Sequence, residues 1–155
     1  MIRCGRIPRD AGLRDMVAKW SYIEWKDSFP ADTPDTYLQI FAEADGSDID
    51  LPFVFVAWLD DKVVGTASLV ADDELPGASE PGPWLAAVYV HPDARRQGIA
   101  NALLAHVEQE AMRIRATSLY LYTHDQADWY ARHGWVHVRV GSLGDRSVDV
   151  MRKDV

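Results

Sequence analysis

The chain has 155 residues, with 16 Lys and Arg against 24 Asp and Glu, so its formal net charge is -8 at pH 7. This length is enough for one domain whose core needs neither disulfides nor a metal, and we expect residues 1–155 to form that single domain. The negative charge disfavours a nucleic-acid partner, because a phosphate backbone would repel it. An acidic surface attracts cations such as polyamines or amino sugars, although acidity also keeps a protein soluble without any such role.

The cysteine content and the N-terminus indicate where the protein works. The single cysteine, Cys4, cannot form an internal disulfide, which fits a reducing cytoplasm. The first residues lack the apolar core of a signal peptide, and no apolar run is long enough to span a membrane. We therefore expect a cytoplasmic protein with no membrane partner. The histidines are scattered and show no spacing typical of zinc, so no metal is expected.

The N-terminal half predicts one strand, two helices and a hairpin. Asp10 is a suitable N-cap for the first helix, and Thr33 with Pro34 is a typical start for the second. Asp60 and Asp61 fit a tight turn between two apolar runs. The predicted elements are a strand at 2–7, helices at 10–27 and 34–44, and strands at 53–59 and 63–70.

The C-terminal half predicts a strand, a long helix and a second strand, in an order that requires a parallel crossover. Asp125 is expected to cap a later, shorter helix, and Gly134 to end it. The loop at 71–83 is unusually long, which suits either a functional loop or a solvated tip. The predicted elements are strands at 84–90 and 118–123, helices at 99–114 and 125–133, and a closing hairpin at 135–140 and 147–152.

The turn from Arg95 to Ala100 follows the strand at 84–90 and opens the long helix. A helix start leaves backbone N–H groups without partners and carries partial positive charge, so it can bind a diphosphate. Gly98 removes a side chain where an anion would approach the backbone. A solvated basic cap is the alternative interpretation of this turn taken alone.

Together with the segment from Tyr130 to Trp135, this turn resembles the GNAT superfamily of N-acetyltransferases. The match covers roughly Trp84 to Trp135, with Arg-x-x-Gly-x-Ala and Tyr-x-x-x-Gly-Trp as its anchors. The resemblance implies an α/β (α+β) single domain. Its central sheet would be mixed and mostly antiparallel, with about seven strands flanked by about four helices, and splayed between strands 4 and 5. It also implies acetyl-CoA as the cofactor.

The resemblance implies a role for each part of the cofactor site. The backbone from Arg95 to Ala100 would hold the pyrophosphate of coenzyme A, and the pantetheine arm would pair along the strand near Val88 and Val90. A bulge in that strand would free the N–H of Ala87 or Val88 for the thioester carbonyl. The residues implied in cofactor binding are Val88, Tyr89, Val90, Arg95, Arg96, Gln97, Gly98, Ile99, Ala100, Asn101, Thr123 and Gln126.

Tyr130 aligns with the tyrosine that many members of this superfamily use as the general acid for the leaving thiolate. A phenol keeps its proton at neutral pH and suits that role, whereas the alternative is a core aromatic of a short helix. Many members carry an asparagine where this chain has Thr123, which leaves that contact open. Gln126 could supply the missing amide.

The general base is a second departure from the superfamily, because the strand at 84–90 contains no carboxylate. His124 is one candidate base. Glu24 and Asp27 are others, at the end of the first helix, where the superfamily builds its acceptor pocket. For each of them, a solvated surface or capping role is the alternative.

We therefore expect an acetyl-CoA-dependent N-acetyltransferase acting on a primary amine of a small molecule or peptide by direct attack in a ternary complex. A catalytically silent acyl-CoA-binding or regulatory module is the first alternative, and an unrelated α/β phosphate-binding domain is the second. The protein is expected to be a monomer or a homodimer, with Trp25 and Phe29 as candidate dimer contacts.

Overall fold

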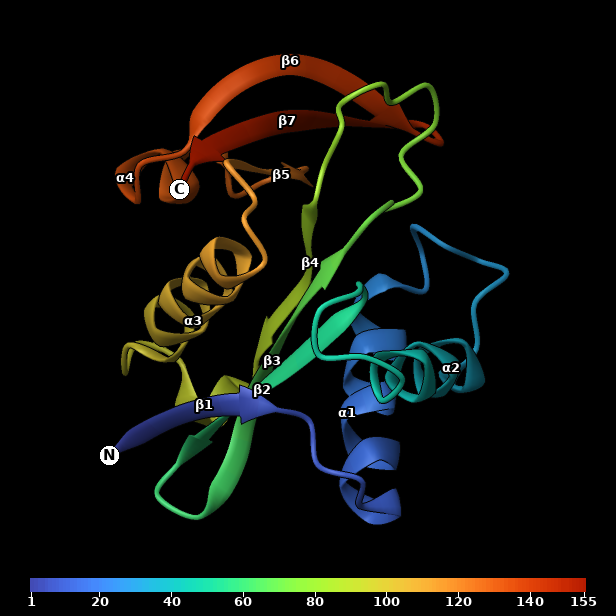
Figure 1. The fold of residues 1–155 in the computed structure, drawn as a ribbon. Coiled ribbons are helices and arrows are strands. Elements are labelled where there is room, and N and C mark those ends of the chain that lie inside the picture. Colours follow the sequence, from blue (N-terminus) through green and yellow to red (C-terminus); the bar gives the residue numbers. More distant parts are fainter.

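All 155 residues are described in a computed structural model, in which seven strands form one sheet (Figure 1). The strands are β1 (Ile2–Arg6), β2 (Phe53–Leu59), β3 (Lys62–Val70), β4 (Trp84–Val90), β5 (Ser118–Thr123), β6 (Val136–Leu143) and β7 (Arg146–Asp154). Their order is β1-β2-β3-β4-β5-β7-β6, and all neighbours are antiparallel except the β4–β5 pair. The expected mixed, mostly antiparallel sheet is confirmed.

Helices cover both faces of this sheet. The four α-helices are α1 (Ala11–Trp25), α2 (Pro34–Ala44), α3 (Ile99–Arg113) and α4 (Ala127–Arg132), with a short 3-10 turn, η1, at Pro92–Ala94. In Figure 1, α1 and α2 lie together on one side of the sheet and α3 lies on the other. None of these helices is both long and apolar enough to cross a membrane.

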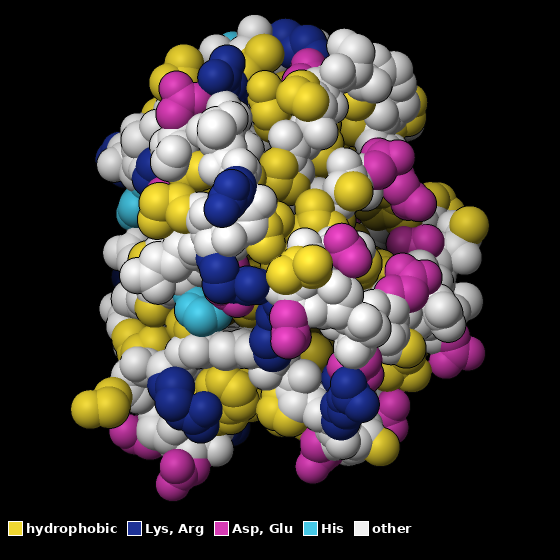
Figure 2. Space-filling view, viewed as in Figure 1, with side chains coloured by type: hydrophobic (Ala, Val, Ile, Leu, Met, Phe, Trp, Pro, Cys, Tyr) yellow, Lys and Arg dark blue, Asp and Glu magenta, His cyan; other side chains and the backbone are white.

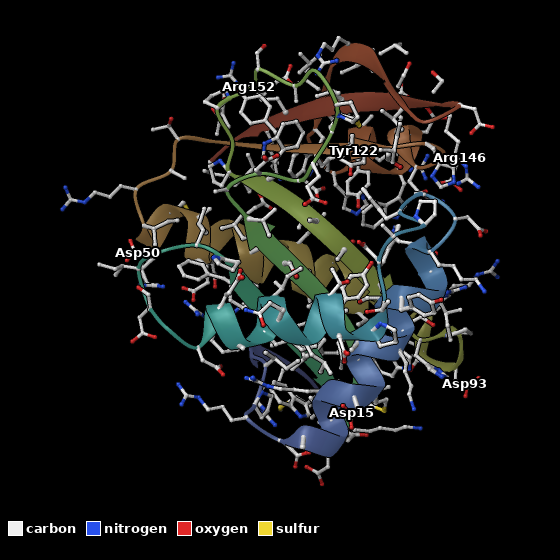
Figure 3. The ribbon with its side chains drawn as sticks, turned by 90° about the vertical axis from the view of Figure 1, so that its right-hand side faces the viewer. Asp15, Asp50, Asp93, Tyr122, Arg146 and Arg152 are labelled. Carbon is white, nitrogen blue, oxygen red and sulfur yellow. The ribbon has the colours of Figure 1, made fainter.

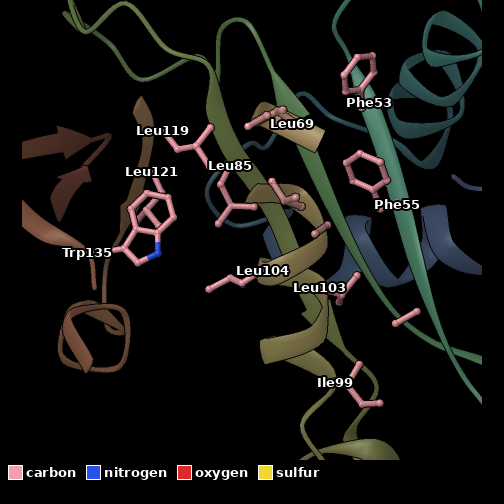
Figure 4. Packing of buried hydrophobic residues seen from close by; sticks show 14 of the residues in the cluster. Phe53, Phe55, Leu69, Leu85, Ile99, Leu103, Leu104, Leu119, Leu121 and Trp135 are labelled. Carbon is pink, nitrogen blue, oxygen red and sulfur yellow. The ribbon is translucent and has the colours of Figure 1, made fainter. Parts of the chain in front are cut away.

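The alternation of residues along β2 explains the two layers. Phe53 and Phe55 face the α3 side, where they join a core cluster that includes Leu103 (Figure 4). Val54 and Val56 point to the opposite face, into a second cluster formed with α1 and α2. Because successive side chains of a strand point to opposite faces, a strand buried on both sides reads as a continuous apolar run. The first five residues of β2, from Phe53 to Ala57, show this pattern of burial on both faces.

β4 and β5 separate soon after they begin. Their only paired residues are Trp84 and Tyr120, so the rest of β4 has no partner on that side. The register between β3 and β4 shifts between Thr66 and Ser68, which leaves two residues, Ala87 and Val88, in a bulge on β4. The sheet is therefore splayed between its fourth and fifth strands, as predicted.

Most of the predicted helix ends are confirmed, and one cap is wrong. The Asp10 side chain accepts a hydrogen bond from the Leu13 N–H at 2.8 Å, as an N-cap does. Asp125 does not cap the last helix, which begins two residues later, at Ala127. The Thr123 hydroxyl accepts the hydrogen bond of the Gln126 N–H at 3.0 Å instead, and so closes the turn. The helix predicted to reach Asp27 ends at Trp25, and both strands of the closing hairpin are longer than predicted.

Candidate active site

A cleft of about 1080 Å³ opens where β4 and β5 separate and continues over the side of the sheet that carries α1 and α2. Its walls come from β4, the end of β5, α4, the first two helices and the loop between β3 and β4. A smaller hollow of about 350 Å³ adjoins it at the start of α3. The two cavities share four residues, Val90, Arg95, Ala100 and Trp129, so they form one continuous site.

The smaller hollow lies at the predicted phosphate turn. Arg96 and Gly98 both have a positive φ, of 63° and 83°, which coils the backbone ahead of α3. As a result, the backbone N–H groups from Arg96 to Asn101 donate no hydrogen bond within the chain. Consecutive free N–H groups at the positive end of a helix dipole fit an anion. The sequence-predicted turn therefore leaves its backbone N–H groups open, which is the geometry that an anion site requires.

The side chains around this turn differ in their roles. Arg95 donates from Nε to the Val90 carbonyl at 3.0 Å, which fixes it at the junction of the two cavities. The side chains of Arg96 and Asn101 are exposed at the smaller hollow. Ile99 is buried in the core, so only its backbone is available to a ligand. Gln97 lines neither cavity, and its side chain donates to the Asp93 carbonyl at 3.4 Å.

The edge of β4 forms the floor of the main cleft. Val88, Tyr89 and Val90 all line it, as predicted for the pantetheine site. Ala87 lies beside them with a φ of 54°, a left-handed conformation that a residue with a side chain rarely adopts. Such a bulge redirects the local N–H groups away from the neighbouring strand. The two residues predicted as oxyanion donors are the two that form it.

Tyr130 lies on α4 and faces the cleft across from β4. Its ring packs against Trp129 and Trp135, with centroid distances of 5.1 and 5.9 Å. Its hydroxyl makes no hydrogen bond within the chain. Burial, with a smaller effect from the negative charge of Asp125, raises the pKa of Tyr130 to about 12. This phenol is both a packing residue and a protonated donor at the cleft.

The segment between β5 and α4 brings Thr123, His124 and Gln126 to the cleft wall. The Thr123 hydroxyl is already used by the Gln126 N–H, so it has less capacity for a ligand. His124 is exposed, with its Nε2 3.5 Å from an Asp125 carboxylate oxygen. The Gln126 side chain makes no hydrogen bond within the chain and remains free to bind.

The two acids predicted for the acceptor pocket separate in the structure. Glu24 lies near the end of α1 and lines the cleft, whereas Asp27 does not. Trp25 and Phe29 also line the cleft and are half-buried, so they form part of its wall rather than a free apolar surface. The expectation that they form dimer contacts assumed that both side chains are exposed, which they are not.

Sequence reasoning missed the wall that the long loop contributes. Asp72, Asp73 and Glu74 come from the loop between β3 and β4, and all three line the cleft opposite Tyr37 of α2. Burial and the nearby carboxylates raise the pKa of Tyr37 to about 12. The length of the loop and its run of acids were the only signals for this site in the sequence. Its position over the cleft depends on tertiary contacts.

The family of the chain follows from its sequence as well as from this geometry. The sequence model described as "Acetyltransferase (GNAT) family" matches residues 15–135, most of the chain. The chain therefore belongs to the GNAT acetyltransferase family, as its two motifs predicted. It is an acetyltransferase with acetyl-CoA as its acetyl donor. The alternative of an unrelated phosphate-binding domain is wrong.

Solved structures with the same fold are acetyltransferases of low sequence identity. One is an aminoglycoside 6'-N-acetyltransferase complexed with coenzyme A (TM-score 0.74, 15% identity, 98% of this chain and 96% of that one). A second is a ribosomal-protein-alanine N-acetyltransferase from Brucella melitensis (TM-score 0.72, 19% identity, 100% and 99%). A third is a GNAT-family acetyltransferase from Streptococcus pneumoniae (TM-score 0.70, 17% identity, 100% and 100%). At these identities the likeness shows the fold alone. No curated protein matches the sequence significantly.

Proposed function

We propose that this protein transfers an acetyl group from acetyl-CoA to a primary amine of a small molecule or peptide, by direct attack within a ternary complex. The observation that carries the proposal is the run of free backbone N–H groups from Arg96 to Asn101, which opens onto the bulged edge of β4. This arrangement suits a ligand with a diphosphate at one end and an extended amide arm at the other.

The residues present fit each part of that donor. The N–H groups at the start of α3 would bind the pyrophosphate, with Arg95 and Arg96 adding positive charge. The unpaired edge of β4 from Val88 to Val90 would bind the pantetheine amides as an additional strand would. Gln126 would supply a further side-chain amide from the opposite wall. When bound, the donor supplies the acyl group as a thioester.

The proton steps are assigned to residues on the two cleft walls. Tyr130 would give its proton to the departing thiolate, since its pKa of about 12 keeps it protonated at neutral pH. An N–H of Ala87 or Val88 in the bulge would donate to the carbonyl oxygen, where negative charge develops. His124 or Glu24 would accept the proton of the incoming amine, directly or through water, because both line the cleft. Asp27 lies outside the cleft, so we do not assign it the role of the base.

The proposal also covers the organisation of the chain. We propose that residues 1–155 act as one domain, as a monomer or homodimer, in the cytoplasm. The one free cysteine, Cys4, is compatible with that compartment. The silent-module alternative rests on the lack of a carboxylate on β4.

Thiol release from acetyl-CoA tests the proposal directly. The rate is measured with amine acceptors, including polyamines, amino sugars and short peptides, and without any acceptor. An amine that accelerates thiol release, with the acetylated amine found by mass spectrometry, supports an enzyme. Tight binding of coenzyme A by calorimetry with no accelerated release from any acceptor would instead favour the silent module.

A further inference from the structure

The loop between β3 and β4 places one carboxylate, that of Asp73, in the cleft without a partner. Its side chain forms no hydrogen bond and no ion pair. Asp73 is partly buried and lines the cleft, where its carboxylate stays accessible to a ligand. Its backbone is held in place, because the Tyr122 hydroxyl donates a hydrogen bond to the Asp73 carbonyl at 2.9 Å.

The surroundings of Asp73 are negative. Asp32, Asp72 and Glu74 line the same part of the cleft, within electrostatic range of Tyr37 and Tyr122. Along the whole cleft, the only Lys or Arg side chains are Arg95, at the phosphate turn, and Arg146, at the start of β7. Figure 2 shows acidic side chains around the hollow on the right-hand side of the molecule, and Figure 3, facing that side, shows Tyr122 and Arg146 above α2.

Two partly buried carboxylates outside this acidic wall have cationic partners, whereas Asp73 and Asp32 have none. Asp45 forms a bidentate ion pair with Arg14, and Glu80 forms one with Arg139. A desolvated carboxylate without a partner is unfavourable, and burial with the neighbouring acids raises the pKa of Asp73 well above its usual range. A cation that entered the cleft would remove this penalty. The protein thus holds an unpartnered carboxyl group in the cleft where the acceptor would enter, and a bound cation would favour its ionised form.

We propose that the acceptor carries a second cationic group besides the amine that is acetylated, and that Asp73 binds this group, with Asp32 and Glu74 adding to the negative field. This inference rests on the proposed function, because it concerns the acceptor of that reaction. Asp73 is then a specificity-determining residue that orients the acceptor. The reacting amine would extend from it toward the bulge on β4. The tyrosine pair, Tyr37 and Tyr122, would enclose the cation between aromatic and acidic surfaces.

A series of acceptors of matched length tests the charge requirement. The diamine putrescine carries a second ammonium, aminobutanol has a hydroxyl in its place, and aminobutyrate has a carboxylate. We expect kcat/KM to fall in that order, with about a tenfold to hundredfold advantage of putrescine over aminobutanol, as for a charge-assisted hydrogen bond. Equal use of putrescine and aminobutanol by the wild type would overturn the inference.

Variants then assign the preference to one residue. Asp73→Asn should remove most of the putrescine advantage, chiefly through KM, with the KM for acetyl-CoA unchanged. Asp73→Glu should recover part of it. Asp61→Asn is the matched control, because Asp61 is an exposed carboxylate in the β2–β3 turn, outside the cleft. An Asp73→Asn variant that keeps the full putrescine advantage would also overturn the inference.

A binding measurement separates this inference from the proposed function. Calorimetry follows putrescine binding to the protein loaded with coenzyme A, whether or not any amine is acetylated. Binding that is lost in Asp73→Asn and kept in Asp61→Asn supports the cation site, even if no amine releases thiol and the proposed function fails. Equal putrescine binding by wild type and Asp73→Asn, or no binding by either, contradicts the cation site.

Discussion

Arg139 on β6 and Glu80 in the loop between β3 and β4 form a bidentate ion pair, in which Nε and Nη2 each lie 2.8 Å from a carboxylate oxygen. The planar guanidinium matches the carboxylate geometry, so the pair holds a defined orientation. It attaches the loop to the C-terminal hairpin, while the Tyr122 hydroxyl attaches the same loop to β5 through the Asp73 carbonyl. Two contacts from distant parts of the chain therefore position the acidic wall of the cleft.

Arg139→Ala should release one of these two attachments. We expect the KM for the amine acceptor to rise roughly threefold to tenfold as the loop gains freedom, with the KM for acetyl-CoA unchanged. Arg152→Ala is the control, since Arg152 pairs with Asp154 at 2.8 Å and does not contact the loop. Steady-state kinetics with both substrates distinguishes the two variants. Unchanged acceptor KM in Arg139→Ala would show that the Tyr122 contact positions the loop by itself.

Gly98→Val should weaken acetyl-CoA binding by distorting the anion turn. An added Cβ at Gly98 would meet nothing closer than the Ile2 Cδ1 at 3.8 Å, so space permits it. The φ of 83° disfavours valine, because a β-branched residue in the left-handed region costs about 1–2 kcal/mol. Relaxing this strain would turn the backbone N–H groups of the turn away from their common direction. Gly144→Val has the same kind of strain at a φ of 62° in the β6–β7 turn. Calorimetry should show lost affinity in Gly98→Val alone; equal affinity in both folded variants would place the phosphates elsewhere.

Arg96→Ala should weaken coenzyme A binding more than binding of a pantetheine analogue without phosphates. The side chain is exposed at the smaller hollow and makes no contact that the fold needs. We expect roughly a threefold to tenfold loss for coenzyme A, reduced at high salt. Arg115→Ala is the control, because Arg115 is also exposed and also has a positive φ, of 65°, but lies beyond the far end of α3. An equal loss for both ligands would mean that Arg96 acts on the fold of the turn.

Tyr130→Phe keeps the ring against Trp129 and Trp135 and removes the hydroxyl. We expect kcat and kcat/KM to fall together by roughly 10²–10⁴-fold, with acetyl-CoA affinity unchanged, because the lost interaction exists mainly in the transition state. Tyr120→Phe, on β5 and away from the cleft, is the control. Wild-type turnover in Tyr130→Phe would make this residue a packing residue.

The pH profile provides a second test of Tyr130. Burial raises its pKa to about 12, so the protonated form that donates persists through neutral and mildly alkaline pH. We therefore expect no alkaline loss of kcat from this group below about pH 11. A wild-type profile that falls on the alkaline side well below this, and a flat profile in Tyr130→Phe, would show that the phenol loses its proton earlier than its burial implies.

Arg14 and Asp45 join α1 to the end of α2 through two short hydrogen bonds, of 2.8 and 2.7 Å. The hydrogen bond from Arg14 holds the pKa of Asp45 below its usual value. The stabilisation is therefore fully present above the unfolded-state pKa of about 4 and is lost as the pH falls below it. Arg14→Ala should lower the free energy of unfolding by about 1–2 kcal/mol at neutral pH and by less in acid. Urea unfolding at both pH values measures this difference; an equal loss at both would point to the hydrogen bonds from Arg14 to the Pro8 and Ile7 carbonyls, which do not depend on pH.

Local features of the site could be predicted because short segments determine them. The Arg95–Ala100 turn, with Gly98 at a positive φ, and the cap at Asp10 depend on a few adjacent residues, so sequence patterns suffice. The position of Tyr130 on the last helix is confirmed, whereas its role as the general acid stays a prediction. The start of the last helix could not be predicted in this way, since the helix begins at Ala127 and not at Asp125. Both Asp125 and the Thr123 hydroxyl can close that turn, and the choice depends on how β5 leaves the sheet.

Sequence patterns were enough to predict the family, the order of the elements and the coiled turn before α3, since these depend on periodicity, glycine geometry and helix ends. The position of the bulge on β4 depends on tertiary pairing, because Ala87 and Val88 look like any other apolar strand residues until β3 pairs around them. The tertiary structure also decided that Asp73 enters the cleft while Asp27 stays out. Both outcomes require contacts between segments far apart in the chain, whose geometry no local pattern encodes.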